Sequence, residues 1–384
     1  MNSTLSPSGA EAPLSELEDS PSRKLGRRLS RRQHPTPFMI DNIQIINPIT
    51  YPGWDELILS TPNYSFFHSS TWAKVLRESY GYKPLYFTVF KNGGLSAVIP
   101  IMEVNSFLTG KRGVSLPFTD YCDPIVNGDI QFKDLLDYVI EYGKRRRWKS
   151  LEIRGGQNHF RSVSPSSNYL SHVIDLGENE EEIFYGFKDS VRRNIKKANR
   201  EGVEVGIFNS LDSLKEFYRL NCLTRKEHGL PPQPYLFFEN IYEHVIGKKQ
   251  GHVVIASYKG KNIAGAIFFH FGEKAFYKYG ASDLNYQHLR ANNLVMWEAI
   301  KWFYQKGYKS LCLGRTEPEN EGLRQFKSGW GTTEQQINYY RYDLNKGSFV
   351  TGSSKVTGFH NKIFRNTPIP ILNRIGSILY KHVG

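Results

Sequence analysis

The pattern of apolar and polar positions repeats one order of elements twice along the chain. Alternating apolar positions predict strands, and apolar positions three and four apart predict helices. The first copy has a strand pair around a glycine turn, a third strand, a helix and a fourth strand, at 86–90, 97–104, 113–117, 133–146 and 149–154. The second copy has the same order, at 252–258, 262–270, 274–279, 292–305 and 310–313. This repeat predicts two copies of one α/β unit.

The residues around the fourth strand of each copy are also similar. Residues 148–155 read WKSLEIRG, and residues 308–315 read YKSLCLGR. A further strand pattern follows each copy and closes it. We therefore expect one unit over 38–176 and a second over 177–343, with a ligand cleft where the two meet.

Both flanks of these units are basic. Residues 1–37 are rich in serine and proline and lack an apolar period, which is typical of a disordered tail. Residues 344–384 contain six Lys or Arg and no Asp or Glu, and they end in a short amphipathic helix pattern. Its apolar face is expected to contain Ile371, Leu372, Ile375, Ile378 and Leu379. Two interpretations stay open: the helix lies on an anionic membrane surface, or it docks on the protein's own body.

Composition places the chain among globular proteins. Its 384 residues are 39% hydrophobic and 14% aromatic, enough for two units with cores of their own. No apolar run approaches the roughly eighteen residues of a membrane-spanning helix, and the start lacks the apolar stretch of a secretory signal. The three cysteines lie far apart, which argues against a disulfide framework or a zinc site. We expect a cytoplasmic protein, with peripheral contact at the inner face of the membrane as one option.

Charge and motifs narrow the function. The net charge of +13 favours phosphate-bearing partners such as nucleotides, nucleic acid or anionic lipid headgroups. The sequence contains no G-x-x-x-x-G-K-[ST], G-x-G-x-x-G, G-x-S-x-G or H-E-x-x-H motif. Phosphoryl transfer, hydride transfer, serine hydrolysis and zinc hydrolysis therefore lose support. We expect neither a metal ion nor a bound cofactor.

A predicted helix at 190–201 concentrates positive charge, with Arg192, Arg193 and Lys196 in its first turns. Like charges three or four apart repel, at a cost of roughly 0.2–0.5 kcal/mol per pair on an exposed helix. A bound phosphate would offset that repulsion, and arginine suits bidentate phosphate binding. The helix is therefore either a phosphate site or a solvated basic face.

Two segments of the second copy carry side chains suited to a cleft. The fourth strand runs into Gly314-Arg315, which places a guanidinium at the carboxyl edge of the sheet, where α/β proteins bind ligands. The next segment offers Lys327 between Phe326 and Trp330. The alternative is that both rings belong to the core and the lysine extends outward.

The third strand of the second copy bears Tyr277 and Tyr279. Side chains alternate along a strand, so we expect both phenols on one face of the sheet. There they either line a wet cleft or pack against side chains of neighbouring strands.

Together these residues resemble the Fem-type family of aminoacyl and peptidoglycan-bridge transferases, and the wider group of acyltransferases that share its tandem GNAT architecture. The matching pieces follow one another in order over roughly 60–342. They are Phe67-His68-Ser69-Ser70-Thr71-Trp72, Ser115-Leu116-Pro117-Phe118, Arg192-Arg193-x-x-Lys196-Lys197-Ala198-x-x-x-Gly202, Thr224-Arg225, Tyr277-x-Tyr279-Gly280-Ala281-Ser282, Gly314-Arg315 and Phe326-Lys327-x-x-Trp330-Gly331.

The resemblance implies an α/β fold of the α+β kind, with two tandem GNAT-like domains, mixed and mainly antiparallel sheets and flanking helices. It implies transfer of an acyl or aminoacyl group, without a metal, to an amine of a phosphate-bearing cell-envelope precursor of peptidoglycan or polysaccharide. The donor stays open between an aminoacyl-tRNA and an acyl-CoA. The turn that cradles the CoA pyrophosphate in GNAT enzymes reads Gln-His-Leu-Arg-Ala-Asn at 287–292, with side chains in place of its glycines.

Site residues follow from the same resemblance. We expect Lys327, Tyr279 and Asp120 to carry catalysis, with Lys327 stabilising the oxyanion. The base is Asp120 or Asp123, in the loop after Pro117, or else the acceptor's own carboxylate. The alternative for both aspartates is a turn-forming role. The expected substrate-binding residues are Arg192, Arg193, Lys196, Tyr277, Arg315, Phe326, Trp330 and Trp72.

Two other functions stay open at this point. A CoA-dependent N-acetyl- or acyltransferase on a polysaccharide or lipid precursor would bind acetyl-CoA rather than charged tRNA. A non-catalytic module for RNA or a membrane surface, built on a decayed transferase fold, would bind with steep salt dependence and transfer no acyl group.

Overall fold

The computed structural model describes residues 43–177, 179–352 and 359–384. The disordered basic tail predicted at 1–37 lies outside the described residues.

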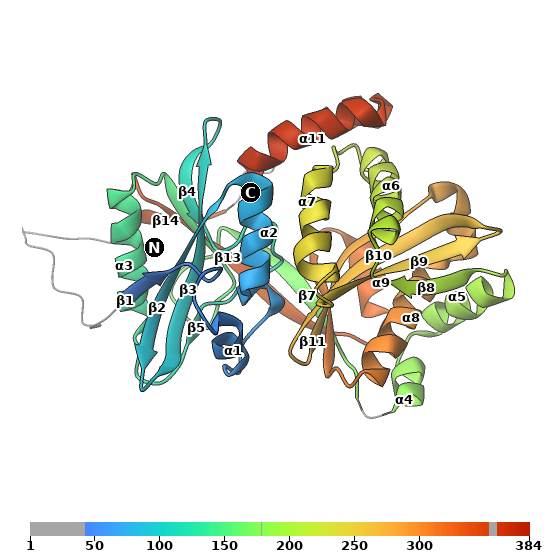
Figure 1. Cartoon of the computed structure of the whole chain (residues 1–384), viewed down its shortest axis with the longest axis horizontal. Coiled ribbons are helices and arrows are strands. Elements are labelled where there is room, and N and C mark those ends of the chain that lie inside the picture. Colours follow the sequence, from blue (N-terminus) through green and yellow to red (C-terminus); the bar gives the residue numbers. More distant parts are fainter. Residues whose placement is uncertain (1–42, 178, 353–358) are drawn as a thin grey trace, which may run out of the picture. The chain divides into compact units, whose positions relative to one another are not determined.

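Both halves contain the predicted order of elements (Figure 1). The first half contains strands β2 (Lys83–Lys91), β3 (Gly94–Ser106) and β4 (Gly110–Val114), helix α3 (Phe132–Arg145) and strand β6 (Ser150–Arg154). The second half contains strands β9 (Gly251–Tyr258), β10 (Lys261–Phe271) and β11 (Lys274–Ser282), helix α8 (Ala291–Gln305) and strand β12 (Ser310–Thr316). The predicted repeat of elements is therefore confirmed.

Other elements precede, connect and follow these two sets. Before and within the first half are β1 (Ile43–Ile46), α1 (Trp54–Leu59), a short 3-10 turn (Phe66–His68), α2 (Ser70–Tyr80) and β5 (Ile125–Val126). Between the halves are β7 (Ser167–Asp175), α4 (Glu180–Tyr185), α5 (Asp189–Arg200), β8 (Glu204–Phe208), α6 (Leu211–Glu227) and α7 (Tyr235–Ile241), which a π-helical turn (Tyr242–Ile246) extends. A 3-10 helix (Leu284–Leu289) precedes α8. After β12 are α9 (Glu321–Ser328), β13 (Thr333–Asp343), β14 (Ser348–Val350), α10 (Phe359–Asn366) and α11 (Ile369–Val383).

The closing strands of the two halves are exchanged. The sheet has the order β1-β2-β3-β4-β6-β13-β7-β12-β11-β10-β9-β8. Strand β7, which follows the first half in sequence, pairs with β12 of the second half, and β13, which follows the second half, pairs with β6 of the first. The two closing strands also pair with each other. One continuous sheet therefore joins the halves, and each half is completed by a strand from the other.

Each half contains one parallel strand pair in an otherwise antiparallel sheet. Strand β4 runs parallel to β6, and β11 runs parallel to β12. The β11–β12 pairing ends at Phe276 and Cys312, although β11 continues to Ser282 and β12 to Thr316. The two strands are not paired beyond that point, so their ends diverge.

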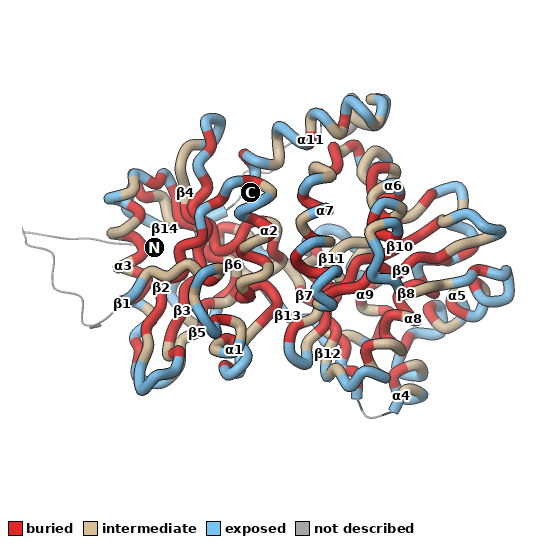
Figure 2. Tube along the Cα trace, viewed as in Figure 1, coloured by how far each residue is buried: buried red, intermediate tan, exposed pale blue. Residues whose placement is uncertain are grey.

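Helices cover both faces of this sheet, and many of the sheet's residues are buried (Figure 2). One core lies between the sheet and helices α1, α2, α6 and α7, which come from both halves. A second core lies on the opposite face of the second half, under α5 and α8, and a third lies under α3 in the first half. Helix α2 packs directly on α7, so the first core also spans the junction.

A β-bulge in β11 changes which way its side chains point. Ile267 of β10 pairs with Tyr279, but the next residue, Phe268, pairs with Tyr277, so Lys278 is an extra residue. Tyr277 consequently packs in the core under α8, with its ring 5.4 Å from that of Phe268. Tyr279 packs on the opposite face, in the core beneath α6 and α7. The prediction that both tyrosines share one face is wrong, because the extra residue reverses the alternation.

Helix α11 docks on the body of the protein, and this confirms the interpretation that its sequence forms a helix packed on the protein itself. It packs against α6 and β3 (Figure 1). The hydroxyl of Tyr82 donates to the carbonyl oxygens of Tyr380 and Lys381, each at 3.1 Å. The expected apolar face is divided: Leu372 is buried against the body, whereas Ile371 and Ile378 are exposed.

The glycine at position 280 leaves room for the side chain of Tyr277. A Cβ atom built there would fall on the hydroxyl oxygen of Tyr277 and 2.8 Å from its Cζ atom. Gly280→Ala should therefore lower the free energy of unfolding by about 1–3 kcal/mol, as overpacking of a core does. Urea denaturation measures the change.

Two variants test the reason for that loss. Gly322→Ala is the control, because nothing lies within 4 Å of a Cβ at Gly322, and it should be neutral or slightly stabilising. Adding Tyr277→Phe to Gly280→Ala should recover part of the stability by removing the hydroxyl. Equal stability of the Gly280→Ala and Gly322→Ala proteins would contradict the proposed clash.

Candidate active site

A cleft of about 550 Å³ lies at the junction of the two halves. The loop after β4, strand β6, helix α6 and the loop after it, the diverging ends of β11 and β12, and helix α11 all contribute to its wall. The lining residues are Phe118, Thr119, Asp120, Arg154, Asn221, Thr224, Arg225, His228, Gln233, Lys278, Tyr279, Gly280, Arg315, Tyr380, Val383 and Gly384. Their side chains include four cations and one carboxylate, so the cleft suits an anionic ligand.

Asp120 is that carboxylate, and it lies in the loop 115–124 of the first half. Its Oδ2 atom is 3.3 Å from Nζ of Lys278, which belongs to the second half. Burial alone would raise the pKa of the Asp120 carboxyl, but Lys278, Arg315 and Lys327 together hold that pKa below its usual range. Asp120 is therefore ionised at neutral pH and links the two halves electrostatically.

Lys278, the extra residue of the bulge, is buried beside Asp120. Its ammonium donates to the carbonyl oxygen of Phe118 at 2.7 Å and lies 5.1 Å from the centre of the Phe67 ring. Burial lowers the pKa of Lys278, and Asp120 opposes that shift. The sequence pattern did not identify Lys278, because regular alternation would have placed it on the face opposite Tyr279.

Lys327 lies in α9 and is 3% exposed. Its ammonium donates to the carbonyl oxygens of Gly314 and Arg315, at 3.0 and 2.8 Å. Burial lowers the pKa of Lys327 to about 8, against the opposing effect of Asp120. The alternative in which this lysine extends into solvent is wrong, because the diverging end of β12 offers two carbonyl acceptors inside the protein.

Arg315 connects the cleft to the exchanged strands. Its guanidinium donates to the hydroxyl of Tyr339 in β13 at 2.8 Å and lies 4.3 Å from the centre of the Tyr169 ring in β7. The Tyr339 hydroxyl donates in turn to the backbone oxygen of Asp120 at 2.6 Å. The position of Arg315 therefore depends on both closing strands.

Two further arginines face the cleft from opposite halves. Arg154 of β6 pairs with Glu152 at 2.8 Å, and Arg225 of α6 donates to the hydroxyl of Tyr380 in α11 at 2.7 Å. Burial raises the pKa of Tyr279 well above its ordinary value, so its phenol stays protonated between these groups. The wall thus offers hydrogen-bond donors on several sides.

The structure brings only some of the predicted site residues to this cleft. Asp120, Tyr279 and Arg315 line it, and Lys327 lies directly behind Arg315. Trp72, Trp330 and Tyr277 belong to the hydrophobic cores.

The basic residues of α5 lie elsewhere. Arg192 donates to the backbone oxygen of Tyr185 at 2.9 Å and pairs with Asp189, while Arg193 and Lys196 are exposed. None of these three cations is among the residues that line the junction cleft. Their role in phosphate binding stays a prediction.

A second cleft, of about 330 Å³, lies at the start of α8. Phe326 of α9 and the first residues of α5 line it, together with Gln287, Arg290 and Asn292. Arg290 precedes α8 in a left-handed conformation, with φ of 61°. Side chains thus occupy the turn where GNAT enzymes expose backbone N–H groups to a pyrophosphate.

The described residues contain neither a grouped set of metal ligands nor a membrane-spanning helix. Within 43–177, 179–352 and 359–384, no three His, Cys, Asp or Glu side chains are grouped as metal ligands. In the same part of the chain, every helix is too short or too polar to cross a bilayer. The three cysteines are buried free thiols.

Known proteins are similar to this chain in sequence and in architecture. A family model described as an acetyltransferase (GNAT) domain matches residues 186–328. A lipid II:glycine glycyltransferase from Staphylococcus haemolyticus is 32% identical, over 78% of this chain and 92% of the relative. A UDP-N-acetylmuramoylpentapeptide-lysine N(6)-alanyltransferase from Weissella viridescens is 22% identical, over 72% of this chain and 88% of that enzyme. The crystal structure of FemX matches with a TM-score of 0.63 and 16% identity, over 76% of this chain and 95% of FemX.

These likenesses extend across both halves and are not confined to the stretch that the family model matches. They confirm the predicted fold class, a mixed and mainly antiparallel sheet with flanking helices in two GNAT-like halves. The similarity to the glycyltransferase covers most of this chain and most of that enzyme. The chain therefore belongs to the Fem-type family of aminoacyl and peptidoglycan-bridge transferases.

Proposed function

We propose that the protein transfers an aminoacyl group from an activated ester to an amine of a phosphate-bearing cell-envelope precursor, bound in the junction cleft. One observation carries this proposal: four cations line the cleft around the single carboxylate Asp120, and a fifth, Lys327, is buried directly behind them. The similar enzymes transfer glycine to lipid II, or alanine to the lysine of a UDP-linked pentapeptide.

The arginines suit the phosphate end of such an acceptor. Arg154, Arg225 and Arg315 line one cleft and come from β6, α6 and β12. Guanidinium groups bind phosphate oxygens in pairs, and partial burial strengthens those contacts. The acceptor's phosphates therefore anchor it, while its amine reaches the acyl carbon.

The chemistry requires only positioning and charge stabilisation. The amine nitrogen forms a bond to the ester carbonyl carbon, the carbonyl oxygen takes up negative charge, and the carbon–oxygen bond to the donor then breaks. The amine loses a proton, and the departing oxygen gains one. An ammonium has three N–H donors. Two of those on Lys327 meet carbonyl oxygens, and we assign the third to the oxyanion.

Asp120 fits the role of an organiser better than that of a base. Its pKa is held low by the surrounding cations, so it accepts a proton poorly at neutral pH. Its charge keeps Lys278, Arg315 and Lys327 together despite their mutual repulsion. A carboxylate at this position also accepts hydrogen bonds from an incoming amine.

An aminoacyl-tRNA suits the second cleft better than an acyl-CoA does. The side chains of Gln287, Arg290 and Asn292 line that cleft, at the turn before α8. Residues 287–292 lack the glycines that let backbone N–H groups approach a CoA pyrophosphate closely. The two similar enzymes named above are a glycyl- and an alanyltransferase.

Direct assay of two donors tests this function. Purified protein is incubated with UDP-linked muramyl pentapeptide and either labelled alanyl- and glycyl-tRNA or labelled acetyl-CoA. We expect labelled peptide from an aminoacyl-tRNA only. Product from acetyl-CoA alone would replace this proposal with a CoA-dependent transferase. Salt-sensitive RNA binding without product from either donor would identify a non-catalytic module.

Lys327 should control turnover and its pH dependence. Lys327→Met should lower kcat by about 10²-fold or more, the scale of losing one oxyanion donor. Because burial brings its pKa to about 8, wild-type kcat should fall as pH rises through about 8 and the ammonium loses its proton. The residual activity of Lys327→Met should lack this fall in kcat at alkaline pH.

The control is Lys306→Met, which removes an exposed lysine. Wild-type kcat in Lys327→Met would remove this lysine from the mechanism.

Arg225 should act on acceptor binding rather than on turnover. Arg225→Gln should raise KM for the acceptor by about 10- to 100-fold, with little change in kcat, because a charge-assisted phosphate contact is lost. Steady-state kinetics with varied acceptor measures both constants.

Two controls separate this charge from its structural contacts. Arg219→Gln removes an exposed arginine of the same helix, and Tyr380→Phe removes the hydroxyl that Arg225 contacts while keeping the charge. Both should leave the acceptor KM near its wild-type value. A rise in KM for Tyr380→Phe equal to that for Arg225→Gln would show that the arginine only holds α11 in place.

A further inference from the structure

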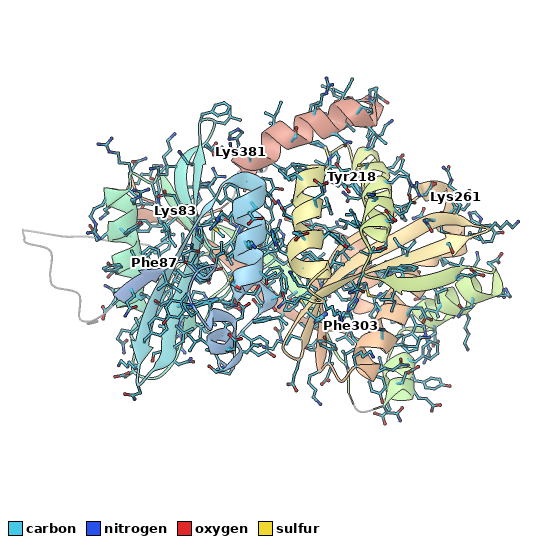
Figure 3. The ribbon with its side chains drawn as sticks, viewed as in Figure 1. Lys83, Phe87, Tyr218, Lys261, Phe303 and Lys381 are labelled. Carbon is cyan, nitrogen blue, oxygen red and sulfur yellow. The ribbon has the colours of Figure 1, made fainter. Side chains whose placement is uncertain are left out.

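The outer face of α11 combines apolar and cationic side chains. Ile371, Arg374, Ile378 and Lys381 follow one another at spacings of three and four residues, so they form one stripe on the helix. All four are exposed, and the two isoleucines retain 50% and 61% of their accessible surface. Figure 3 shows Lys381 at the end of the helix that adjoins the first half.

The hairpin between β3 and β4 extends this stripe. Its tip carries Phe107 and Leu108, which are 82% and 56% exposed. Two adjacent large apolar residues at a protruding tip are unusual on a soluble surface unless they meet a partner. The ring of Phe107 lies 4.4 Å from that of His382, and Thr109 donates to the backbone oxygen of His382 at 3.1 Å. The tip and the helix therefore form one continuous surface.

We propose that this surface, defined as Phe107 and Leu108 with Ile371, Arg374, Ile378 and Lys381, binds an anionic lipid bilayer. Apolar side chains at a protruding edge insert between headgroups, and interspersed cations attract anionic lipids. Residues 344–384 contain six Lys or Arg and no Asp or Glu, so carboxylates of this segment do not oppose that attraction.

A second copy of this chain is a poorer occupant. A twofold contact places the same surface against itself. Arg374 and Lys381 would then face a partner surface with the same positive stripe and no carboxylate from its own segment 344–384. A bilayer that contains anionic lipid supplies the opposite charge over the whole stripe.

The position of α11 connects this surface with the junction cleft, and this connection rests on the proposed function. Tyr380 and Val383, on the same helix, line the junction cleft. Helix α11 thus lies between the cleft and the proposed bilayer. A lipid-linked acceptor held in that bilayer would present its headgroup at the rim of the cleft, where Arg225 contacts Tyr380.

Vesicle sedimentation of the full chain tests the surface directly. Vesicles of phosphatidylcholine with phosphatidylglycerol should retain the wild-type protein, and vesicles of phosphatidylcholine alone should retain much less. Arg374→Gln with Lys381→Gln should weaken binding by about 25-fold, at about fivefold per cation. Phe107→Ser with Leu108→Ser should weaken it by at least tenfold, on the order expected for two buried apolar side chains.

A control variant that lacks two other lysines, and a tryptophan that reports insertion into the bilayer, test whether this surface is the one that binds. Lys248→Gln with Lys249→Gln removes the same charge from an exposed loop and should weaken binding by less than threefold. An equal loss in that pair would overturn the proposal in favour of diffuse electrostatic attraction. Phe107→Trp should show a blue-shifted emission with anionic vesicles, and an unshifted emission would also overturn it. A change of oligomeric state in the surface variants without vesicles would instead identify a second copy as the occupant.

Transfer assays separate this proposal from the proposed function. Both surface variants should keep wild-type transfer to the soluble UDP-linked acceptor and lose at least tenfold in transfer to a lipid-linked acceptor in vesicles. Vesicle binding without transfer to either acceptor would defeat the proposed function and leave the surface standing. Equal transfer to both acceptors by every variant would defeat the surface alone.

Discussion

The ion pair between Asp120 and Lys278 is the interaction on which the arrangement of the cleft depends. The carboxylate comes from a loop of the first half, and the ammonium comes from a bulged strand of the second. Arg315 and Lys327 approach the same carboxylate, so three buried cations share one negative charge. Without that charge, the repulsion among these three cations would destabilise this part of the second half, and the two halves would lose an electrostatic link between them. The surplus of positive charge that remains suits an anionic ligand.

The order of elements could be read from the sequence, because periodicity is a local property of the chain. Both strand pairs, both crossover helices and the strands after them lie where apolar spacing predicts them. The exchange of β7 and β13 could not be read in this way. A strand pattern shows which residues face a core, but it does not show which neighbouring strand supplies hydrogen bonds.

A site residue could be predicted from the sequence where it lies at the end of a regular strand. It could not be predicted where the backbone is irregular. Arg315 lies at the cleft because β12 ends there. Lys278 was missed because one extra residue in β11 turns it toward Asp120 and separates Tyr277 from Tyr279. The charge density of α5 drew attention to Arg192 and its neighbours, yet the cleft is lined by arginines that stand singly in the sequence. Arg154 and Arg225 come from distant segments, and their convergence on the cleft leaves no local signal in the sequence.

The exchanged strands have a consequence for the history and engineering of this architecture. A copy on its own has no second half for its closing strand to complete. Dividing the gene between the two copies would yield two fragments. Each fragment would contain a closing strand without its pairing partners and a sheet with an unpaired edge, and unpaired edges promote aggregation. When the two fragments are synthesised together, we expect them to reassemble, because each contains the closing strand that completes the sheet of the other.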